Sequence, residues 1–145
     1  MTRLSLLVNA GGLKVIHSVV IASGYVHHGD PVAFFVAPTG LVFDSSTGNL
    51  FVASTGDNAV FVLQHALGIS SSQGKGTIVY QDNVHLHGAL ALAEAPNGDL
   101  LVSNNDTINP DPTQPSEVVE FTKQGAFVKE LSICLLYTSS CDPDS

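Results

Sequence analysis

Two stretches decide the fold: PTGLVFDSSTGNLFVAS at 38–54 and GALALAEAPNGDLLVSN at 88–104. When Gly48 is placed on Gly98, the turn triplets TGN and NGD coincide, and so do the apolar residues that follow each turn. The offset, 98 − 48, gives a repeat of 50 residues. An internal repeat of this length is typical of a protein built from copies of one small sheet.

The match extends beyond the two turns. It continues with DNAVFVLQ (57–64) over PSEVVEFT (115–122), and with GTIVYQD (76–82) over GAFVKEL (125–131). Each copy then reads as four short strands separated by turns and polar loops, which is the pattern of an antiparallel meander. Val, Ile, Phe and Thr dominate these segments, and no window of about 11 residues sustains a helical apolar stripe. We therefore predict an all-β protein.

A single twisted four-stranded sheet cannot bury both of its faces until neighbouring sheets stack on it around an axis. A repeat of four strands therefore favours a β-propeller, with each copy forming one blade. A β-sandwich would also contain many short strands, but it would not produce this internal match.

The first copy, PTGLVFDSSTGNLFVASTGDNAVFVL (38–63), resembles an NHL-type propeller repeat. In that repeat a Gly-Leu-apolar-Asp strand leads through a Gly-Asn turn to a Leu-apolar-Val-Ala strand, and Asp-Asn precedes the third strand. The second copy departs from it: Ala91 stands at the Leu41 position, Glu94 at the Asp44 position, and the loop before the third strand is enlarged to DTINPDPTQP (106–115). The resemblance spans roughly residues 24–133. It implies the fold more than the function, because the family includes sugar and lactone hydrolases as well as protein-binding and RNA-binding modules.

The predicted organisation follows from this alignment. It comprises a partial blade at 1–23, made of the strands TRLSLLVN and LKVIHSVVIA, a blade at 24–82, a blade at 83–133 and a tail at 134–145. The tail begins CLLYTS, which is similar to a read-through peptide of DNA-library vectors, so we expect it to be non-native; a natural strand with a disordered tail is the alternative.

About two and a half blades do not close a ring, because propellers have about four to eight. We therefore expect a fragment of a longer gene that forms a homodimer or homotrimer of about six blades. A composition with 12% charged and 44% apolar residues also favours self-association.

Charge and hydropathy exclude other partners. The chain has 5 Lys and Arg against 13 Asp and Glu, a formal charge of -8, so nucleic acid and anionic membrane surfaces are repelled. No apolar run reaches the roughly 18 residues of a membrane span, and the run in MTRLSLLVNAGG is too short for a signal peptide. We expect the expressed chain to be soluble and cytoplasmic, and a secreted parent protein stays open.

Four of the six histidines lie in two similar stretches, VHHGD (26–30) and VHLHG (84–88). In a propeller both stretches are loops between blades, on the same face as STGDN (54–58) and SNNDTINPD (103–111). The resemblance implies that this face surrounds the mouth of the central channel, so we expect polar side chains to converge there. They are His27, His28, Asp30, His85, His87, Asn104, Asn105 and Asp106.

In an extended chain His85 and His87 point to one side while Leu86 points to the other, so the pair is suited to holding one ion. Imidazole suits zinc, and carboxylate or amide oxygens suit calcium or manganese. We predict a divalent-metal site (Zn, Mn or Ca) formed by His85, His87, Asn104 and Asp106. The resemblance adds that hydrolytic six-bladed propellers hold a catalytic ion with Asn, Asp and Glu from such loops, and SNND (103–106) is similar to one of them. Turn capping and bonds to loop carbonyls are the alternative role of these side chains.

Two functional hypotheses follow. In the first, the assembled ring is a metal-dependent hydrolase of small esters, lactones or phosphoesters, in which the ion activates a water molecule. In the second, it is a non-catalytic propeller scaffold that binds a ligand or a protein. The sequence contains no GxSxG, HExxH, P-loop or CxxC motif, so it gives no support to serine-hydrolase, zincin, nucleotide-phosphate or thiol-redox chemistry.

Overall fold

The structure is a computed structural model that describes residues 1–31, 34–110 and 117–132. The predicted tail at 134–145, and the part of the 106–115 loop beyond residue 110, lie outside the described residues. Every element in the described ranges is a β-strand, which confirms the all-β class. None of these elements is an apolar helix of membrane-spanning length.

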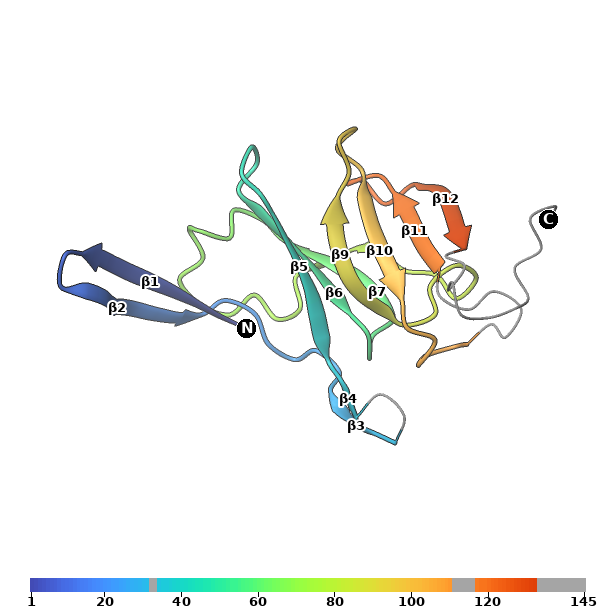
Figure 1. Ribbon diagram of the computed structural model, residues 1–145, viewed down its shortest axis with the longest axis horizontal. Coiled ribbons are helices and arrows are strands. Elements are labelled where there is room, and N and C mark those ends of the chain that lie inside the picture. Colours follow the sequence, from blue (N-terminus) through green and yellow to red (C-terminus); the bar gives the residue numbers. More distant parts are fainter. Residues whose placement is uncertain (32–33, 111–116, 133–145) are drawn as a thin grey trace.

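Two four-stranded antiparallel sheets form the body of the protein (Figure 1). The first sheet contains, in chain order, β5 (Pro38–Asp44), β6 (Asn49–Ser54), β7 (Ala59–Leu63) and β8 (Thr77–Tyr80). The second contains β9 (Ala89–Glu94), β10 (Leu100–Asn104), β11 (Glu117–Phe121) and β12 (Phe127–Ser132). Each sheet is a meander of consecutive strands, as the repeat predicts, and the pair is consistent with a fragment of a β-propeller-like fold.

The two first hairpins share their turn chemistry but differ in length. Gly48 and Gly98 both have positive φ angles, 74° and 89°, which glycine adopts without a steric penalty. In the first hairpin Asp44 pairs with Asn49, and in the second Glu94 pairs with Leu100. The second connection is therefore one residue longer, so the ungapped alignment is out of register by one residue along β9.

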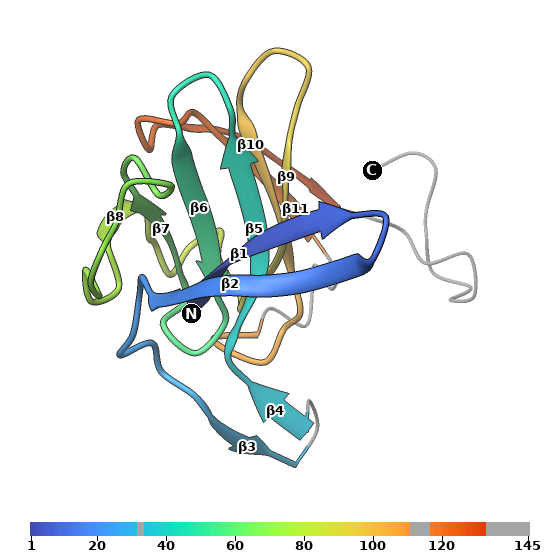
Figure 2. The same ribbon diagram turned by 90° about the vertical axis from the view of Figure 1, so that its left-hand side faces the viewer.

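Two smaller sheets precede this body. β1 (Thr2–Asn9) pairs with β2 (Gly12–Val20), and β3 (His28–Asp30) pairs with β4 (Phe34–Val36). The strands expected at 1–23 do form, but as a two-stranded hairpin that projects from the first sheet (Figure 2). VHHGD, expected to be a loop, contributes the whole of β3, which pairs antiparallel with β4.

The main core lies between the two four-stranded sheets. Side chains that alternate along the strands meet there, and Tyr80 stacks on Phe121 with ring centroids 4.6 Å apart and planes 11° apart. The other buried members are Phe51, Ala53, Val60, Val62, Leu86, Ala89, Leu100, Val102 and Val119.

A second core covers the opposite face of the first sheet. Ile21, Ala22 and Tyr25, in the segment after β2, pack against Val52 and Phe61 of that face. The Tyr25 and Phe61 rings meet edge to face, with centroids 5.5 Å apart. The chain between β2 and β3 thus covers the first sheet on the side away from the second sheet.

A lysine ties the two sheets together. Lys123, in the turn between β11 and β12, donates from Nζ to Asp44 Oδ2 at 2.9 Å and to Glu94 Oε1 at 2.7 Å. Hydrogen bonds from Ser46, Lys123 and Thr47 hold the pKa of Asp44 well below its usual value, and they outweigh the opposing effect of burial. Asp44 is therefore ionised at neutral pH and attracts Lys123 across the sheet interface.

We expect the stability contribution of Asp44 to depend on pH. Because its pKa is lower in the folded than in the unfolded chain, the contribution is present above the unfolded value of 3.8 and is lost as the pH falls through the folded pKa. Urea unfolding at several pH values checks this: Asp44→Asn is less stable than wild type at pH 6, and the difference shrinks toward pH 2. Asp99→Asn, at a turn carboxylate that forms no ion pair with the described residues, serves as the control. A difference that stays constant with pH would contradict the assignment.

Close approach of β5 to β9 requires a glycine at position 40. A Cβ atom added there would lie 2.7 Å from the Leu90 carbonyl oxygen and 2.8 Å from the Leu92 nitrogen. We expect Gly40→Ala to lower the free energy of unfolding by about 1–3 kcal/mol, because the two backbones must move apart. Gly68→Ala is the matched control, since its added Cβ would meet only His65 O at 3.5 Å. Equal urea midpoints for the two variants would refute this account of the sheet packing.

Candidate metal centre

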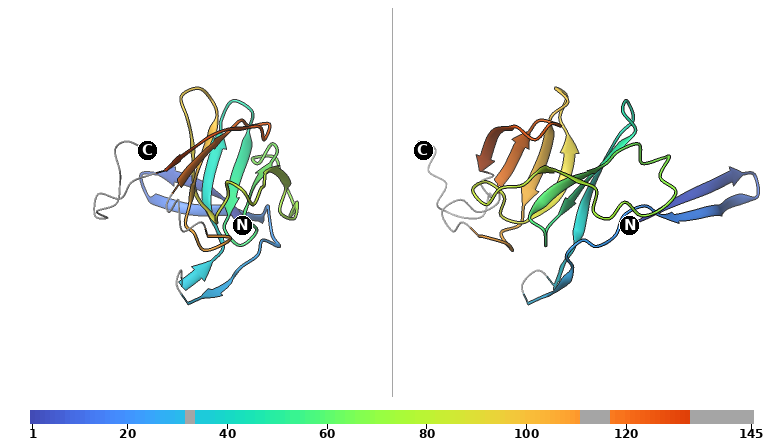
Figure 3. Two further views of the ribbon diagram at one scale, coloured as in Figure 1. Left: turned by 90° about the vertical axis from the view of Figure 1, so that its right-hand side faces the viewer. Right: turned by 180° about the vertical axis from the view of Figure 1, so that it is seen from behind.

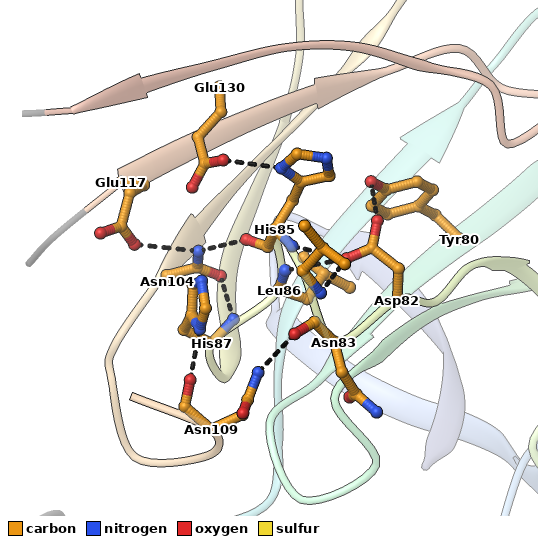
Figure 4. A network of polar contacts seen from close by, with 11 residues as sticks. Tyr80, Asp82, Asn83, His85, Leu86, His87, Asn104, Asn109, Glu117 and Glu130 are labelled. Carbon is orange, nitrogen blue, oxygen red and sulfur yellow. Dashed lines mark hydrogen bonds and ion pairs between the residues drawn. The ribbon is translucent and has the colours of Figure 1, made fainter. Parts of the chain in front are cut away.

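The segment that joins the two sheets, residues 82–88, is held by side-chain acceptors along its whole length (Figure 4). Asp82 Oδ1 accepts hydrogen bonds from the backbone N–H groups of Val84, His85 and Leu86 at 3.0, 2.7 and 3.2 Å. The next two N–H groups, of His87 and Gly88, donate to Asn104 Oδ1 at 3.0 Å and to Asn58 Oδ1 at 2.8 Å. The loop that carries both histidines is therefore fixed from both sheets.

Asp82 is ionised in this network. Burial by itself would raise the pKa of its carboxyl, but hydrogen bonds from the Tyr80 hydroxyl and from the three backbone N–H groups outweigh burial and lower it. The same contact acts on the phenol: burial, and then the hydrogen bond to Asp82, raise the pKa of Tyr80. At neutral pH a charged acceptor thus faces three backbone donors and a neutral phenol.

Two asparagines hold the segment through both ends of their amide groups. Asn58, from the first sheet, donates to Leu86 O at 2.7 Å, and Asn104, from the second, donates to His85 O at 2.7 Å. Leu86 itself is fully buried in the core between the sheets, as expected from the alternation of the HxH stretch.

Three potential ligand groups meet beside this segment: His87, Glu117 and Glu130. One ligand atom from each lies within 4.8 Å of the other two. Glu117 begins β11, and Glu130 on β12 pairs with Val119. Because Glu117 and Val119 alternate on one side of the strand, both carboxylates lie on the face that packs against the first sheet.

The histidine of this group has a defined tautomer. His87 Nδ1 makes a close contact with the carbonyl oxygen of Asn109, and a carbonyl only accepts hydrogen bonds. Nδ1 therefore carries a hydrogen, which leaves Nε2 as the ring nitrogen that can bind a cation. Hydrogen bonding of one ring nitrogen to a backbone carbonyl is how proteins commonly orient histidine ligands.

Glu117 is the most deeply buried member of the group, with no exposed surface. Its Oε2 accepts a hydrogen bond from Asn104 Nδ2 at 3.1 Å. Its Oε1 is buried and has no hydrogen-bond partner within residues 1–31, 34–110 and 117–132. A buried carboxylate oxygen is costly unless a donor or a cation satisfies it, so this atom is an open acceptor in the group.

His85 adjoins the group without belonging to it. Its Nδ1 donates to Glu130 Oε2 at 2.7 Å, and its ring stacks on Phe127 with centroids 3.9 Å apart. Among the described residues, the atoms within mutual reach of one ion come from His87 and the two glutamates. Both histidines of the HxH stretch thus lie near Glu130: His85 is hydrogen-bonded to it, and His87 is grouped with it as a potential metal ligand.

The remaining predicted site residues fall into two sets. Asn104 donates to both His85 O and Glu117 Oε2. Asn105 Oδ1 accepts a hydrogen bond from Thr107 N at 3.0 Å, as in turn capping. Asp106 lies in the same loop with a φ of 55°. His27 and His28 contact carbonyl oxygens of their own segment, those of Tyr25 and Gly29, at 3.1 and 2.9 Å.

Asp30 ends β3. The structure therefore brings His85, His87 and Asn104 together with the two glutamates. His28 and Asp30 lie in β3 and His27 directly precedes it, apart from β11 and β12 (Figure 1).

Glu117 and Glu130 were missed from the sequence, where they look like solvent-facing charges on alternating strands. A signal for Glu117 exists in EVVEF (117–121): Glu117, Val119 and Phe121 share one face, and a face with Val and Phe is expected to be buried. No such local signal marks Glu130, because its approach to His85 depends on the packing of the two sheets.

No protein-family model matches the chain, and no curated protein matches its sequence.

We expect Asn104 to contribute strongly to the stability of this network. Asn104→Ala removes the acceptor of His87 N and the donor to His85 O and Glu117 Oε2, and the groups left behind are largely buried. We expect a loss of about 2–3 kcal/mol in the free energy of unfolding, measured by urea denaturation. Asn97→Ala, at an exposed turn, is the control and should cost less than about 1 kcal/mol. Equal losses for the two variants would show that the network is not what holds the segment.

Proposed function

We propose that this chain binds one divalent cation through Nε2 of His87 and the carboxylates of Glu117 and Glu130. The observation that carries the proposal is the mutual approach of the three ligand atoms within 4.8 Å, with one buried Glu117 oxygen lacking a hydrogen-bond donor in the described ranges. A cation there would satisfy that oxygen and offset two carboxylates in a chain whose formal charge is already -8.

The ligand chemistry favours zinc or manganese. An imidazole with two carboxylates is a donor set typical of these ions, whereas calcium takes about six to eight oxygen ligands. We therefore expect calcium to bind more weakly than zinc. Each of the three groups also has a hydrogen-bond partner that orients it: the Asn109 carbonyl for His87, Asn104 for Glu117 and His85 for Glu130.

Hydrolysis is the candidate reaction of such a centre. Three protein ligands leave a coordination position for water, as in catalytic rather than structural zinc sites, and a bound ion lowers the pKa of that water to near neutrality. Glu130 has 17% of its side chain exposed, so it offers the route to solvent. The substrate class is a small ester, lactone or phosphoester, and the NHL-type resemblance of the first repeat adds support for a propeller-like frame.

A non-catalytic role remains the competing proposal. Two surface hollows, one lined by Gln64, His65 and Gln73 and the other by Arg3, His17 and Ser70, include none of the three ligands. In that case the ion would join the two sheets, and ligands would bind elsewhere on the scaffold.

The direct test is isothermal titration of metal-free protein with ZnCl₂, MnCl₂ and CaCl₂. We expect one zinc or manganese ion per chain, and a loss in affinity of at least about tenfold in Glu117→Gln, which keeps the acceptor for Asn104 but removes the charge. Glu94→Gln is the matched control, because Glu94 pairs with Lys123 instead of joining the group. No binding, or equal binding by both variants, would refute the site.

Catalysis is tested separately with p-nitrophenyl esters and phosphodiesters. If the centre is hydrolytic, activity requires zinc or manganese, is removed by EDTA and falls in Glu117→Gln but not in Glu94→Gln. Stoichiometric metal without metal-dependent turnover would contradict the hydrolase and favour the scaffold.

A further inference from the structure

The β1–β2 hairpin exposes apolar side chains on both of its faces. Leu6, Leu7 and Val8 follow one another along β1 with relative exposures of 47%, 46% and 71%, and successive residues of a strand point to opposite faces. On β2, Leu13 and Ile16 are exposed by 65% and 59%. A two-stranded ribbon is marginal in water by itself, so a ribbon with two apolar faces is expected to be covered by another surface.

Only the base of the hairpin packs on its own chain. The N-terminal amine donates to Ala22 O at 2.6 Å, and Arg3 donates to Ala66 O at 2.7 Å. Met1 and Val19 are the hairpin residues that pack against the second core. The rest projects away from the first sheet (Figure 3).

A second, partly exposed surface lies on the opposite side of the molecule, and we call it the bare face. It is the face of the second four-stranded sheet that points away from the first sheet. Cross-strand pairing places Ala93, Leu101, Glu120 and Lys129 in one row of this face, and Ser103, Val118 and Leu131 in the next. Leu131 is 48% exposed.

The internal repeat indicates how this face can pack, because the corresponding residues of the first sheet lie in the core between the sheets. Leu101 and Val118 align with Phe51 and Val60 of the first sheet, which are 2% and 0% exposed because the second sheet packs on them. Leu101 and Val118 are partly exposed. The repeat-equivalent surface is therefore buried against a sheet in one copy and partly exposed in the other.

The hairpin of the same chain does not reach this face. The hairpin lies on one side of the first sheet and β12 lies on the other, at opposite ends of the molecule (Figure 1). A hairpin that covers the bare face must therefore come from a second copy.

Charge favours that pairing. Residues 1–23 contain Arg3 and Lys14 and no acidic residue, a charge of +2, whereas the charged residues in the rows of the bare face, Glu120 and Lys129, form an ion pair at 3.1 Å. Two hairpins carry charge of the same sign and repel each other, whereas a hairpin meets no net positive charge in these rows. The observations thus favour a contact between unlike surfaces over a symmetric contact between hairpins.

We propose that copies of this chain associate head to tail, with the β1–β2 hairpin of one copy packed on the bare face of the second four-stranded sheet of the next. The interface is heterologous, and it closes into a ring when the rotation between copies permits. Each copy supplies two four-stranded sheets, so three copies would place six of them around one axis. The inference is independent of the metal centre, whose glutamates lie on the other face of the second sheet.

The mass in solution tests the association. Light scattering coupled to size exclusion should give two or three times 15.1 kDa, that is 30.2 or 45.3 kDa, for the wild-type chain. Val8→Thr with Leu13→Thr replaces a cross-strand apolar pair at the hairpin tip by two β-branched, strand-compatible Thr residues, and we expect this variant to be monomeric. Val84→Thr is the matched control, because Val84 is also 71% exposed but lies in the connecting loop, and it should keep the wild-type mass.

A mixing experiment tests the direction of the contact. Leu131→Glu should abolish association through the acceptor face, while the hairpin variant abolishes it through the donor. Mixed together, the two variants retain one intact interface and should form a 1:1 complex of 30.2 kDa, twice 15.1 kDa. A wild-type chain that is monomeric at about 1 mM would overturn the proposal, and so would two variants that fail to combine although circular dichroism shows both to be folded.

Discussion

Five consecutive backbone N–H groups, from Val84 to Gly88, donate to side-chain oxygens of Asp82, Asn104 and Asn58. We call these five hydrogen bonds the clamp, and the rest of the structure depends on them. The segment crosses from one sheet to the other, where β-ladder partners are out of reach. Backbone donors buried without acceptors would cost on the order of 1–3 kcal/mol each. Here one carboxylate and two side-chain amides accept these hydrogen bonds. A loop can therefore occupy the space between two sheets as a strand would.

The clamp also determines where chemistry is possible. It buries Leu86 in the shared core, which turns His85 and His87 toward the second sheet, where Glu130 lies. Asn104 serves both purposes, because the amide that holds the backbone of the segment also donates to Glu117. A candidate ligand set on a loop is thus supported by the same interactions that join the two sheets, and rigid support of this kind is what a metal site needs.

The sequence is informative where the interactions are local or repeated. The 50-residue period and the glycine turns predict the eight strands of the two sheets, and period-two alternation predicts the burial of Leu86. The one-residue difference between the two hairpin connections is not predictable, because an ungapped match is equally satisfied by either length.

The candidate ligand set was predictable only in part. His87 is found from the HxH pattern, but Glu117 and Glu130 reach it through the antiparallel pairing of β11 with β12 and the stacking of the sheets, which no short motif encodes. The isolation of the β1–β2 hairpin is likewise a property of three-dimensional packing, since its strands look like the others in sequence.

Native-state hydrogen exchange of the amides from Val84 to Gly88 measures the clamp directly. If side-chain acceptors fix this segment, its amides exchange as slowly as those of the central strands β6 and β10, and Asp82→Ala accelerates the first three selectively. Rapid exchange of all five in the wild-type chain, at the rate of an exposed loop such as 70–73, would contradict the account.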